Sequence, residues 1–351
     1  MYTLITGDKN WIESEAISQL KNVAEYGHVV QAVGLPDLHP GKTPVGVSVV
    51  CDNYIYPHLI GNDIGCGMSL FDSNIKLKKF NMDKWVTRLN YIKELACIET
   101  GGSFDSPIRD LGTIGGGNHF VEFQKIEEVF LEDEFEALKA DKKDVFVLIH
   151  SGSRGYGQKI YSEFNKTEGY EAFSLEAVEY LLCQKDAIFW AKKNREIVAG
   201  KLIDWLGYTQ QLNCVLDCSH NYIENKGPLF IHRKGAVANT GGPVIIPGSR
   251  GTLTYIVKPI GEPQFSGYSL SHGAGRKWAR SVCIGKVADK YTRDTVRHTG
   301  LKSQVVCHNT NLLYKEAPEV YKNINTIIEI LIEYGLIEII ATMRPLITYK
   351  G

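Results

Sequence analysis

Helix-like and strand-like segments alternate along this chain without the regular strand–helix–strand repeat that builds a parallel sheet. Helical periodicity of the apolar residues predicts helices over 11–24, 82–96, 175–198, 276–297 and 320–334. Short runs rich in β-branched residues and bounded by glycine or proline predict strands over 29–35, 45–51, 145–150, 244–246, 253–257 and 339–343. The pattern favours an α+β fold in which central β-sheets are flanked by helices.

The domain organisation follows from what the chain lacks. A length of 351 residues allows either one large or two ordinary domains, since single cores usually stop growing near ~250–300 residues. Low-complexity tracts, fixed-period repeats and long linkers rich in proline or serine are absent from the sequence. We therefore expect one compact domain over 1–351.

Charge and hydropathy exclude several classes of protein. With 39 Lys and Arg against 40 Asp and Glu, the net charge of −1 excludes a uniformly basic nucleic-acid coat. A hydrophobic content of 44 % and a charged content of 23 % are typical of a folded globular protein. Asp8 and Lys9 interrupt any signal-peptide core, and no run approaches the ~20 apolar residues of a membrane span. We expect a cytoplasmic protein with reduced cysteines and no membrane association.

Seven short blocks place glycine beside polar and metal-binding side chains. Glycine lets the backbone approach a ligand closely and supplies unusual turns, and seven such blocks exceed what ordinary loops would contribute. The blocks are GLPDLHPGK (34–42), IGNDIGCGM (60–68), LGTIGGGNHF (111–120), LIHSGSRGYG (148–157), IHRKGA (231–236), IIPGSRG (245–251) and SHGAGR (271–276).

Five side chains within or near these blocks are candidate metal ligands. Asp63 and Cys66 lie three residues apart in a glycine-punctuated turn, and His119, His150 and His220 follow or lie within strand-like or glycine-rich segments. A thiolate, imidazoles and one carboxylate suit manganese, zinc or cobalt better than magnesium. The alternatives are that each histidine is an ordinary core or surface residue and that Cys66 is a small buried hydrophobe.

Taken together, the blocks resemble the RtcB-type RNA ligases, which join RNA ends in tRNA splicing and RNA repair with GTP and manganese. The resemblance runs from about Gly34 to the last residue, in the form of a short variant with a compressed link between HRKGA and PGSRG. It is carried most specifically by DIGCGM, GGGNHFVE, HSGSRG, HRKGA with PGS, SHGAGR, EAPEVYK and the terminal RP…KG, in the family's order. It implies a single RtcB-like catalytic domain.

The resemblance implies two manganese ions in the catalytic site. Cys66 would bridge them, with Asp63 and His119 on one ion and His150 and His220 on the other. The ions would neutralise charge that develops on the reacting phosphates.

His272, within SHGAGR, would be the nucleophile according to the resemblance. It would attack the α-phosphorus of GTP and form a guanylyl-histidine, which divides one difficult condensation into easier steps. The alternative is a loop histidine with a structural hydrogen bond.

The resemblance also implies a guanine nucleotide site. Lys350 would contact the base and Tyr321 would stack on it, although Tyr321 could equally be helix packing and Lys350 a frayed terminal residue. Further nucleotide contacts would come from Asn118, Glu122, Ser249, Thr254, Gly273, Ala274 and Gly275.

Arginines mark candidate contacts with RNA phosphate, because guanidinium favours bidentate binding of phosphate. Arg276 and Arg280 would lie on a helix that follows SHGAGR, within a segment, 276–302, that holds eight basic and two acidic residues. Arg154 follows His150 by four residues and is a third candidate. By resemblance, Asp37 and His39 either support the site from behind or hold the incoming 5′-hydroxyl end.

The function that these residues favour is an RNA ligase. It would join a 2′,3′-cyclic phosphate or 3′-phosphate end to a 5′-hydroxyl end through guanylyl-histidine and an RNA-3′-pp-5′-G intermediate. Its partner would be RNA from tRNA splicing or RNA repair, with an activating helper protein as a further candidate. The rivals are a metal-dependent phosphohydrolase or end-capping nucleotidyl transferase, and an RNA-binding accessory protein without catalysis.

Overall fold

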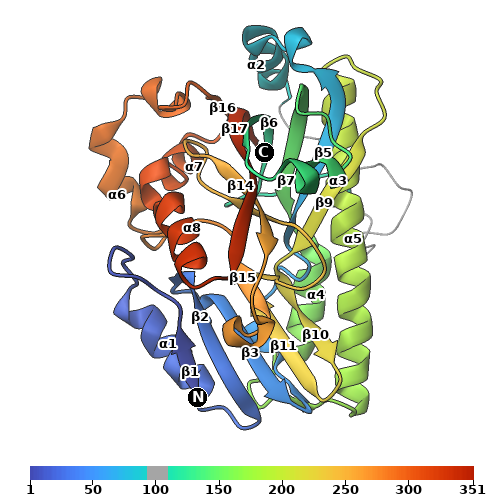
Figure 1. Cartoon of the computed structure of the whole chain (residues 1–351), viewed down its shortest axis with the longest axis vertical. Helices are drawn as coiled ribbons and strands as arrows, with labels where there is room; N and C mark the ends of the chain where they lie inside the picture. Colours follow the sequence, from blue (N-terminus) through green and yellow to red (C-terminus); the bar gives the residue numbers. More distant parts are fainter. Residues whose placement is uncertain (93–109) are drawn as a thin grey trace.

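The computed structural model describes residues 1–92 and 110–351, and most of its strands belong to two sheets (Figure 1). The larger sheet is eight-stranded, and its neighbouring strands are antiparallel except for β16, which runs parallel to β17. In spatial order it contains β13 (Val244–Pro247), β14 (Thr254–Pro259), β17 (Ile337–Lys350), β6 (Phe120–Val129), β7 (Asp144–Ser151), β5 (Gly67–Lys76) and β9 (Asn213–Ser219), with β16 (Gln304–Cys307) paired to β17.

The second sheet is five-stranded and lies below the first in the view of Figure 1. Its order is β1 (Tyr2–Leu4), β2 (Val29–His39), β3 (Val45–Asp52), β11 (Leu229–Lys234) and β10 (Asn221–Lys226). Two short ribbons complete the strands of the described chain: β12 (Ala236–Ala238) with β15 (Ser269–Ser271), and β4 (Tyr54–Ile55) with β8 (Tyr170–Glu171).

Helices cover the outside of the sheets. They are α1 (Ser14–Ala24), α2 (Met82–Asn90), α3 (Glu132–Ala137), α4 (Arg154–Phe164), α5 (Leu175–Trp205), α6 (Cys283–Val287), α7 (Thr310–Lys315) and α8 (Ile324–Glu333). Helix α5 begins where the Ser174 hydroxyl accepts a hydrogen bond from the Ala177 amide. It runs along one side of the molecule (Figure 1) and contacts β5, β7 and β9 of the larger sheet and β10 of the smaller one, so a single helix connects the two.

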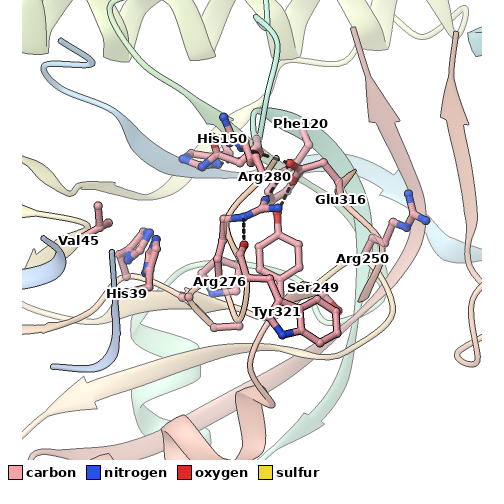
Figure 2. A pocket seen from close by; sticks show the side chains of 18 of the residues that line it. His39, Val45, Phe120, His150, Ser249, Arg250, Arg276, Arg280, Glu316 and Tyr321 are labelled. Atoms are coloured by element: carbon pink, nitrogen blue, oxygen red, sulfur yellow. Dashed lines mark hydrogen bonds and ion pairs between the residues drawn. The ribbon is translucent and has the colours of Figure 1, made fainter. Parts of the chain in front are cut away.

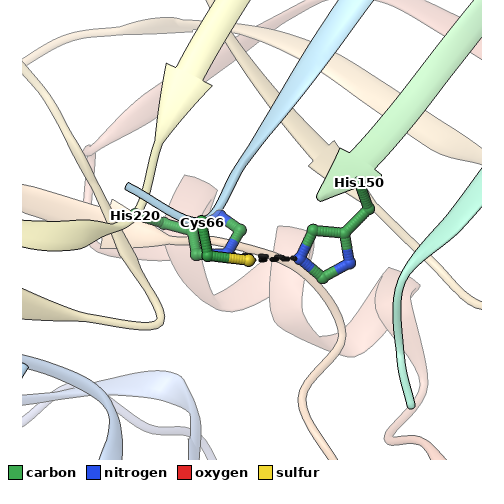
Figure 3. A group of neighbouring side chains, drawn as sticks. All are labelled: Cys66, His150 and His220. Carbon is green, nitrogen blue, oxygen red and sulfur yellow. Dashed lines mark hydrogen bonds between the residues drawn. The ribbon is translucent and has the colours of Figure 1, made fainter. Parts of the chain in front are cut away.

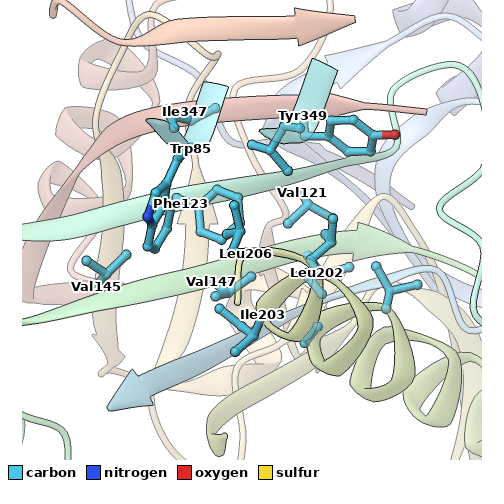
Figure 4. Close-up of a cluster of buried hydrophobic side chains, with 14 of the residues drawn as sticks. Trp85, Val121, Phe123, Val145, Val147, Leu202, Ile203, Leu206, Ile347 and Tyr349 are labelled. Carbon is cyan, nitrogen blue, oxygen red and sulfur yellow. The ribbon is translucent and has the colours of Figure 1, made fainter. Parts of the chain in front are cut away.

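The larger sheet is buried on both faces. Along β7, Val145, Val147 and Ile149 pack in a cluster with the C-terminal half of α5 (Figure 4), whereas Phe146 and Leu148 pack on the opposite face. This alternation follows from the two-residue period of a strand. Because both faces are covered, the ends of the strands are held rigidly, and the candidate site lies at those ends.

The α+β prediction is confirmed. The six predicted strands correspond to β2, β3, β7, β13, β14 and β17, and helices α1, α2, α5 and α8 lie within or overlap their predicted ranges. Residues 93–96 of the predicted 82–96 helix lie outside the described residues. Within residues 1–92 and 110–351, no helix is both long and apolar enough to cross a membrane.

The predicted helix over 276–297 is wrong. Only the five residues of α6 and two short 3₁₀ turns, Ala288–Lys290 and Thr295–Arg297, are helical there. Lys286 and Lys290, and likewise Arg293 and Arg297, would stack like charges four residues apart on a continuous helix.

Candidate active site

The predicted metal ligands come from strand ends that are neighbours in the larger sheet. Cys66 directly precedes β5 and His150 lies in β7, and these strands pair so that Met68 is opposite His150. His119 precedes β6, which pairs with β7, and His220 follows β9, which pairs with β5. The antiparallel order of β6, β7, β5 and β9 therefore gathers residues that are up to 154 positions apart in sequence.

Two overlapping ligand groups share the thiol of Cys66. The first contains Cys66, His150 and His220 (Figure 3), and the second contains Asp63, Cys66 and His119, with ligand atoms within 4.8 Å of one another in each. The Cys66 sulfur lies 3.2 Å from His150 Nε2 and 3.4 Å from His119 Nε2. His150 Nε2 lies 3.3 Å from His220 Nε2, and His119 Nε2 lies 2.9 Å from Asp63 Oδ2.

The donor set fits divalent ions. His150 Nδ1 lies 3.2 Å from the carbonyl oxygen of Asn118, so this nitrogen donates and Nε2 keeps a lone pair directed at the Cys66 sulfur. Such a second hydrogen bond is how proteins set the tautomer of a metal-binding histidine. His119 Nδ1 and His220 Nδ1 are buried and have no hydrogen-bond partner among the described residues.

Burial disfavours the charged forms of the side chains in this cluster and so shifts their pKa values. It raises the pKa of Cys66 well above its ordinary value, and Asp63 adds to the rise. It lowers the pKa of His150 and His220 well below the ordinary value, with the neighbouring histidines acting in the same direction. Burial also opposes ionisation of Asp63, yet its hydrogen bond and charge interaction with His119 lower its pKa to about 2. The cluster thus offers the neutral imidazoles of His150 and His220 and the carboxylate of Asp63 to a cation.

His272 lies next to this cluster and is held by Asp37. His272 follows β15, and its ring centroid is 4.8 Å from that of His220. Asp37 Oδ2 lies 2.7 Å from His272 Nδ1 and also accepts a 3.2 Å hydrogen bond from the His272 amide. Because a carboxylate can only accept, His272 Nδ1 donates to Asp37, and Nε2 is the ring nitrogen left without this contact.

Gly275 allows this close arrangement. It has φ +69°, and a side chain there would meet the Asp37 carbonyl oxygen at 2.3 Å. Only glycine permits this approach of the SHGAGR segment to the Asp37 backbone.

A cavity of about 430 Å³ opens beside His272. Its volume lies within the range of small-ligand sites. Figure 2 shows Arg276, Arg280, Glu316 and Tyr321 on one side of the cavity and His39 on the other. The predicted site residues that line it are His39, Asn118, Glu122, His150, Ser249, His272, Gly273, Ala274, Gly275, Arg276, Arg280, Tyr321 and Lys350.

A buried acid and a buried base face the cavity. Glu122 accepts hydrogen bonds from Thr348 and from Gln124, the latter at 2.6 Å. Burial raises the pKa of Glu122 to about 7. Lys350, at the end of β17, is 4 % exposed, and its amine donates to the carbonyl oxygen of Gly117 at 3.1 Å. Lys350 is therefore an ordered part of the site, not a frayed terminal residue.

Glu316 organises the wall opposite His39, and the sequence analysis did not single it out. Its carboxylate lies 3.0 Å from Arg276 Nη1, 3.6 Å from Lys350 Nζ and 3.7 Å from Arg280 Nε, and it accepts a hydrogen bond from Tyr321. Burial opposes ionisation, but these three cations prevail and lower the pKa of Glu316. The signal was available, because Glu316 is the first residue of the EAPEVYK motif.

The two predicted arginines that line the cavity, Arg276 and Arg280, differ from the prediction. Neither lies on a helix: Arg276 forms an isolated β-bridge with Tyr321, and Arg280 lies in a turn. The Arg276 guanidinium is bonded to Glu316 and to the Lys315 carbonyl oxygen, and lies 5.3 Å from the Tyr321 ring centroid. Arg280 is half exposed and donates to Asn118 Oδ1 at 2.8 Å, so it remains the more accessible phosphate candidate.

Three further predicted residues, Thr254, Arg154 and Asp37, do not line the cavity. Thr254 does not line it; its hydroxyl accepts a 2.9 Å hydrogen bond from Gln124, which in turn donates to Glu122. Arg154 begins α4 with φ +56° and packs against Gly115 outside the lining. His39 Nδ1 lies 2.8 Å from the Asp37 carbonyl oxygen, so Asp37 and His39 form one unit beside His272.

Comparison with known proteins identifies the family. Residues 19–102 and 98–351 match the family described as tRNA-splicing ligase RtcB. RNA-splicing ligase RtcB2 from a strain of Escherichia coli is 39 % identical, over 99 % of this chain and 95 % of the relative. The tRNA-splicing ligase RtcB of Nanoarchaeum equitans is 27 % identical over 97 % and 92 % of the two chains. RNA-splicing ligase RtcB of Escherichia coli K12 is 26 % identical over 97 % and 95 %. The resemblance is confirmed, and the chain belongs to the RtcB family of RNA ligases.

Proposed function

We propose that this enzyme joins RNA ends that carry a 2′,3′-cyclic phosphate or 3′-phosphate to 5′-hydroxyl ends, with GTP and two manganese ions. The observation that carries the proposal is the position of His272. Its Nδ1 is held by Asp37, and its ring lies between the ligand cluster around Cys66 and the cavity. A neutral imidazole with a free Nε2 beside candidate cation ligands is suited to attack on a phosphorus atom.

The cavity suits a guanine base. Guanine presents donors at N1 and N2 and an acceptor at O6, and the cavity offers an acceptor in Glu122 and a donor in Lys350. The Tyr321 ring lines the same space and provides a flat surface for stacking. Ser249 and the backbone of Gly273–Gly275 would then lie along the ribose and phosphates.

The reaction would proceed in three displacements. His272 Nε2 attacks the α-phosphorus of GTP, a P–N bond forms, and pyrophosphate leaves. The RNA 3′-phosphate, after water has opened any cyclic phosphate, attacks the same phosphorus and frees His272. The 5′-hydroxyl oxygen then attacks the RNA phosphorus, and GMP leaves. Activation matters because GMP is a better leaving group than the oxygen of a bare phosphate.

Asp63 and His119 would hold one manganese ion and His150 and His220 the other, with Cys66 contacting both. When bound, the ions supply charge neutralisation on the phosphates and a polarised water for opening the cyclic phosphate. The protein's own contribution is geometric, because the ends of neighbouring strands hold Cys66, His119, His150 and His220, and the turn before β5 holds Asp63.

Membership of this ligase family makes RNA the substrate class, and transcripts from tRNA splicing or from RNA repair are both candidates. We expect the reaction in the cytoplasm, and an activating helper protein is a further candidate partner.

The test of this proposal separates the three products. The purified chain is incubated with labelled GTP, manganese and RNAs with defined ends, and guanylated protein, activated RNA and sealed RNA are resolved. Sealing that requires both GTP and a 5′-hydroxyl end supports the proposal. Dephosphorylated or capped RNA without a joined product would indicate a phosphohydrolase or capping enzyme, and no reaction on any substrate would indicate a binding protein.

Lys350→Met tests base recognition. The substitution keeps the length of the side chain and removes its donor, so the preference for GTP over ATP in adduct formation should fall by about 10- to 100-fold. The measurement is the rate of protein labelling with each nucleotide. Lys125→Met, on the neighbouring strand β6, removes only a half-exposed amine 3.7 Å from Glu127 and should leave selectivity unchanged. If the Lys350 variant keeps the selectivity of the parent chain, another residue recognises the base.

Glu122 should make GTP binding depend on pH. Burial raises the pKa of Glu122 to about 7. Below this pH the carboxyl group is mostly protonated, and it must lose its proton before guanine binds. Acceptance from N1 and N2 requires the carboxylate, so the half-saturating GTP concentration should fall about tenfold from about pH 6 to about pH 8. Adduct formation at several GTP concentrations measures this dependence. Glu122→Gln should flatten it, and an unchanged pH dependence in that variant would exclude the role.

A further inference from the structure

Lys322 binds the backbone carbonyl groups of the two residues that flank Asp37. Its amine donates to the carbonyl oxygen of Pro36 at 3.0 Å and to that of Leu38 at 2.8 Å. The side-chain amide of Asn10 also donates to the Pro36 carbonyl oxygen, at 2.8 Å. Lys322 therefore anchors the short piece of backbone from which the Asp37 carboxylate reaches His272.

This backbone needs an external donor. Strand β2 pairs with β3 at Gly34 with Val47 and next at His39 with Val45, so the register shifts and residues 35–38 bulge out of the ladder. Bulges interrupt ladder hydrogen bonds and are frequent beside active sites, where they re-aim a side chain. The ammonium group of Lys322 provides donors at this bulge.

The backbone of Lys322 is tied to the segment that carries His272. The Lys322 amide donates to the Gly275 carbonyl oxygen at 3.0 Å, and the Lys277 amide donates to the Val320 carbonyl oxygen at 2.7 Å. The bridge between Arg276 and Tyr321 lies between these two hydrogen bonds. One short antiparallel pairing thus connects the ring that lines the cavity, the lysine that holds Asp37 and the loop of the nucleophile.

The surroundings of Lys322 favour a specific role over simple solvation. Burial lowers the pKa of Lys322 to about 8, while Asp37 and Glu13 act in the opposite direction. A buried amine is costly unless it is hydrogen-bonded. The Lys322 amine lies at this bulge, and its two carbonyl partners flank the fully buried Asp37. This arrangement indicates that Lys322 holds Asp37 in position.

We infer that Lys322 is a positioning residue for guanylyl transfer, which fixes the Asp37 bulge and thereby aims the His272 ring at the nucleotide in the cavity. The inference rests on the proposed function. It predicts different effects on binding and on reaction. Lys322 does not line the cavity, so GTP can bind without it. Without Lys322, however, His272 Nε2 would no longer be held in line with the reacting phosphorus.

The experiment uses the full chain with labelled GTP and manganese in the absence of RNA. Lys322→Met keeps the length of the side chain and removes its donors; the maximal rate of adduct formation should fall by about 10- to 100-fold. The half-saturating GTP concentration should change less than about twofold, because no cavity contact is lost. Lys322→Arg, which can donate to both carbonyls, should recover a substantial part of the rate.

Lys234→Met is the matched control. Lys234 is also buried, its pKa is also lowered to about 8 by burial, and its amine donates to Thr43 and not to the bulge. This variant should lose a similar amount of thermal stability and keep the rate of adduct formation. If the two methionine variants lose rate equally, or if Lys322→Met reacts as fast as the parent, the inference is overturned. Absence of any adduct in the parent chain would instead overturn the proposed function.

Discussion

His272→Ala is expected to abolish the covalent GMP adduct, with labelling at least about 1,000-fold below that of the parent chain, because the substitution removes the imidazole that would take the guanylyl group. Sealing of a 3′-phosphate end with GTP should disappear with it. The measurement follows labelled GTP and detects an acid-labile phosphoramidate on the protein. The metal cluster should persist, since its five candidate ligands do not include His272.

Pre-activated RNA separates this loss from general inactivation. A strand that already carries GMP on its 3′-phosphate needs only the final displacement, in which GMP is the leaving group, so the variant should still seal it to a 5′-hydroxyl strand. A labelled adduct that persists in His272→Ala would refute the assignment. Loss of the pre-activated reaction as well would show that the imidazole also shapes the sealing step.

Cys66→Ala should remove metal and activity together. The Cys66 sulfur is within 3.4 Å of both His119 Nε2 and His150 Nε2, and it belongs to both ligand groups. Because even an outer partner of a metal ligand is worth 10- to 100-fold in affinity, loss of a shared ligand should weaken manganese binding by more than about 100-fold. Metal content of the dialysed protein and sealing activity are measured in parallel.

Cys51→Ala controls for the volume that is removed. Cys51 is a fully buried cysteine on β3, outside both ligand groups, so its truncation leaves a comparable cavity without touching a candidate ligand. It should retain two manganese ions per chain. A Cys66→Ala protein that also keeps two ions and seals RNA would show that the thiol is not a ligand.

The sequence predicted those parts of the fold whose signals are local. Buried strands such as β7 are continuous apolar runs, and α5 carries a serine cap, so both can be recognised without their neighbours. Strands β5, β6, β9, β10 and β11 were not predicted, because their exposed or polar positions break the pattern and their stability comes from pairing with distant strands. The false helix over 276–297 arose because apolar periodicity does not register the like charges that a continuous helix would stack there, Lys286 with Lys290 and Arg293 with Arg297.

The site shows the same division. Side chains that belong to short glycine-rich motifs, such as Cys66 and His272, could be named from the sequence because the motif itself marks them. The sequence does not predict which distant residues these side chains contact. The contact between Asp37 and His272 joins residues 235 positions apart, and Glu316 gains its importance only from the cations that gather around it.

Strand β17 ends with Tyr349 and Lys350 on opposite sides. Tyr349 is buried in the core beside α5, and Lys350 lines the cavity beside His272. The register against β6 shifts between Pro345 and Ile347, only a few residues earlier. A slip of one residue beyond that bulge would turn the tyrosine towards the cavity and drive the lysine into the core. Under the proposed function, an insertion or deletion in this stretch would therefore change the choice of base without replacing any side chain that lines the cavity.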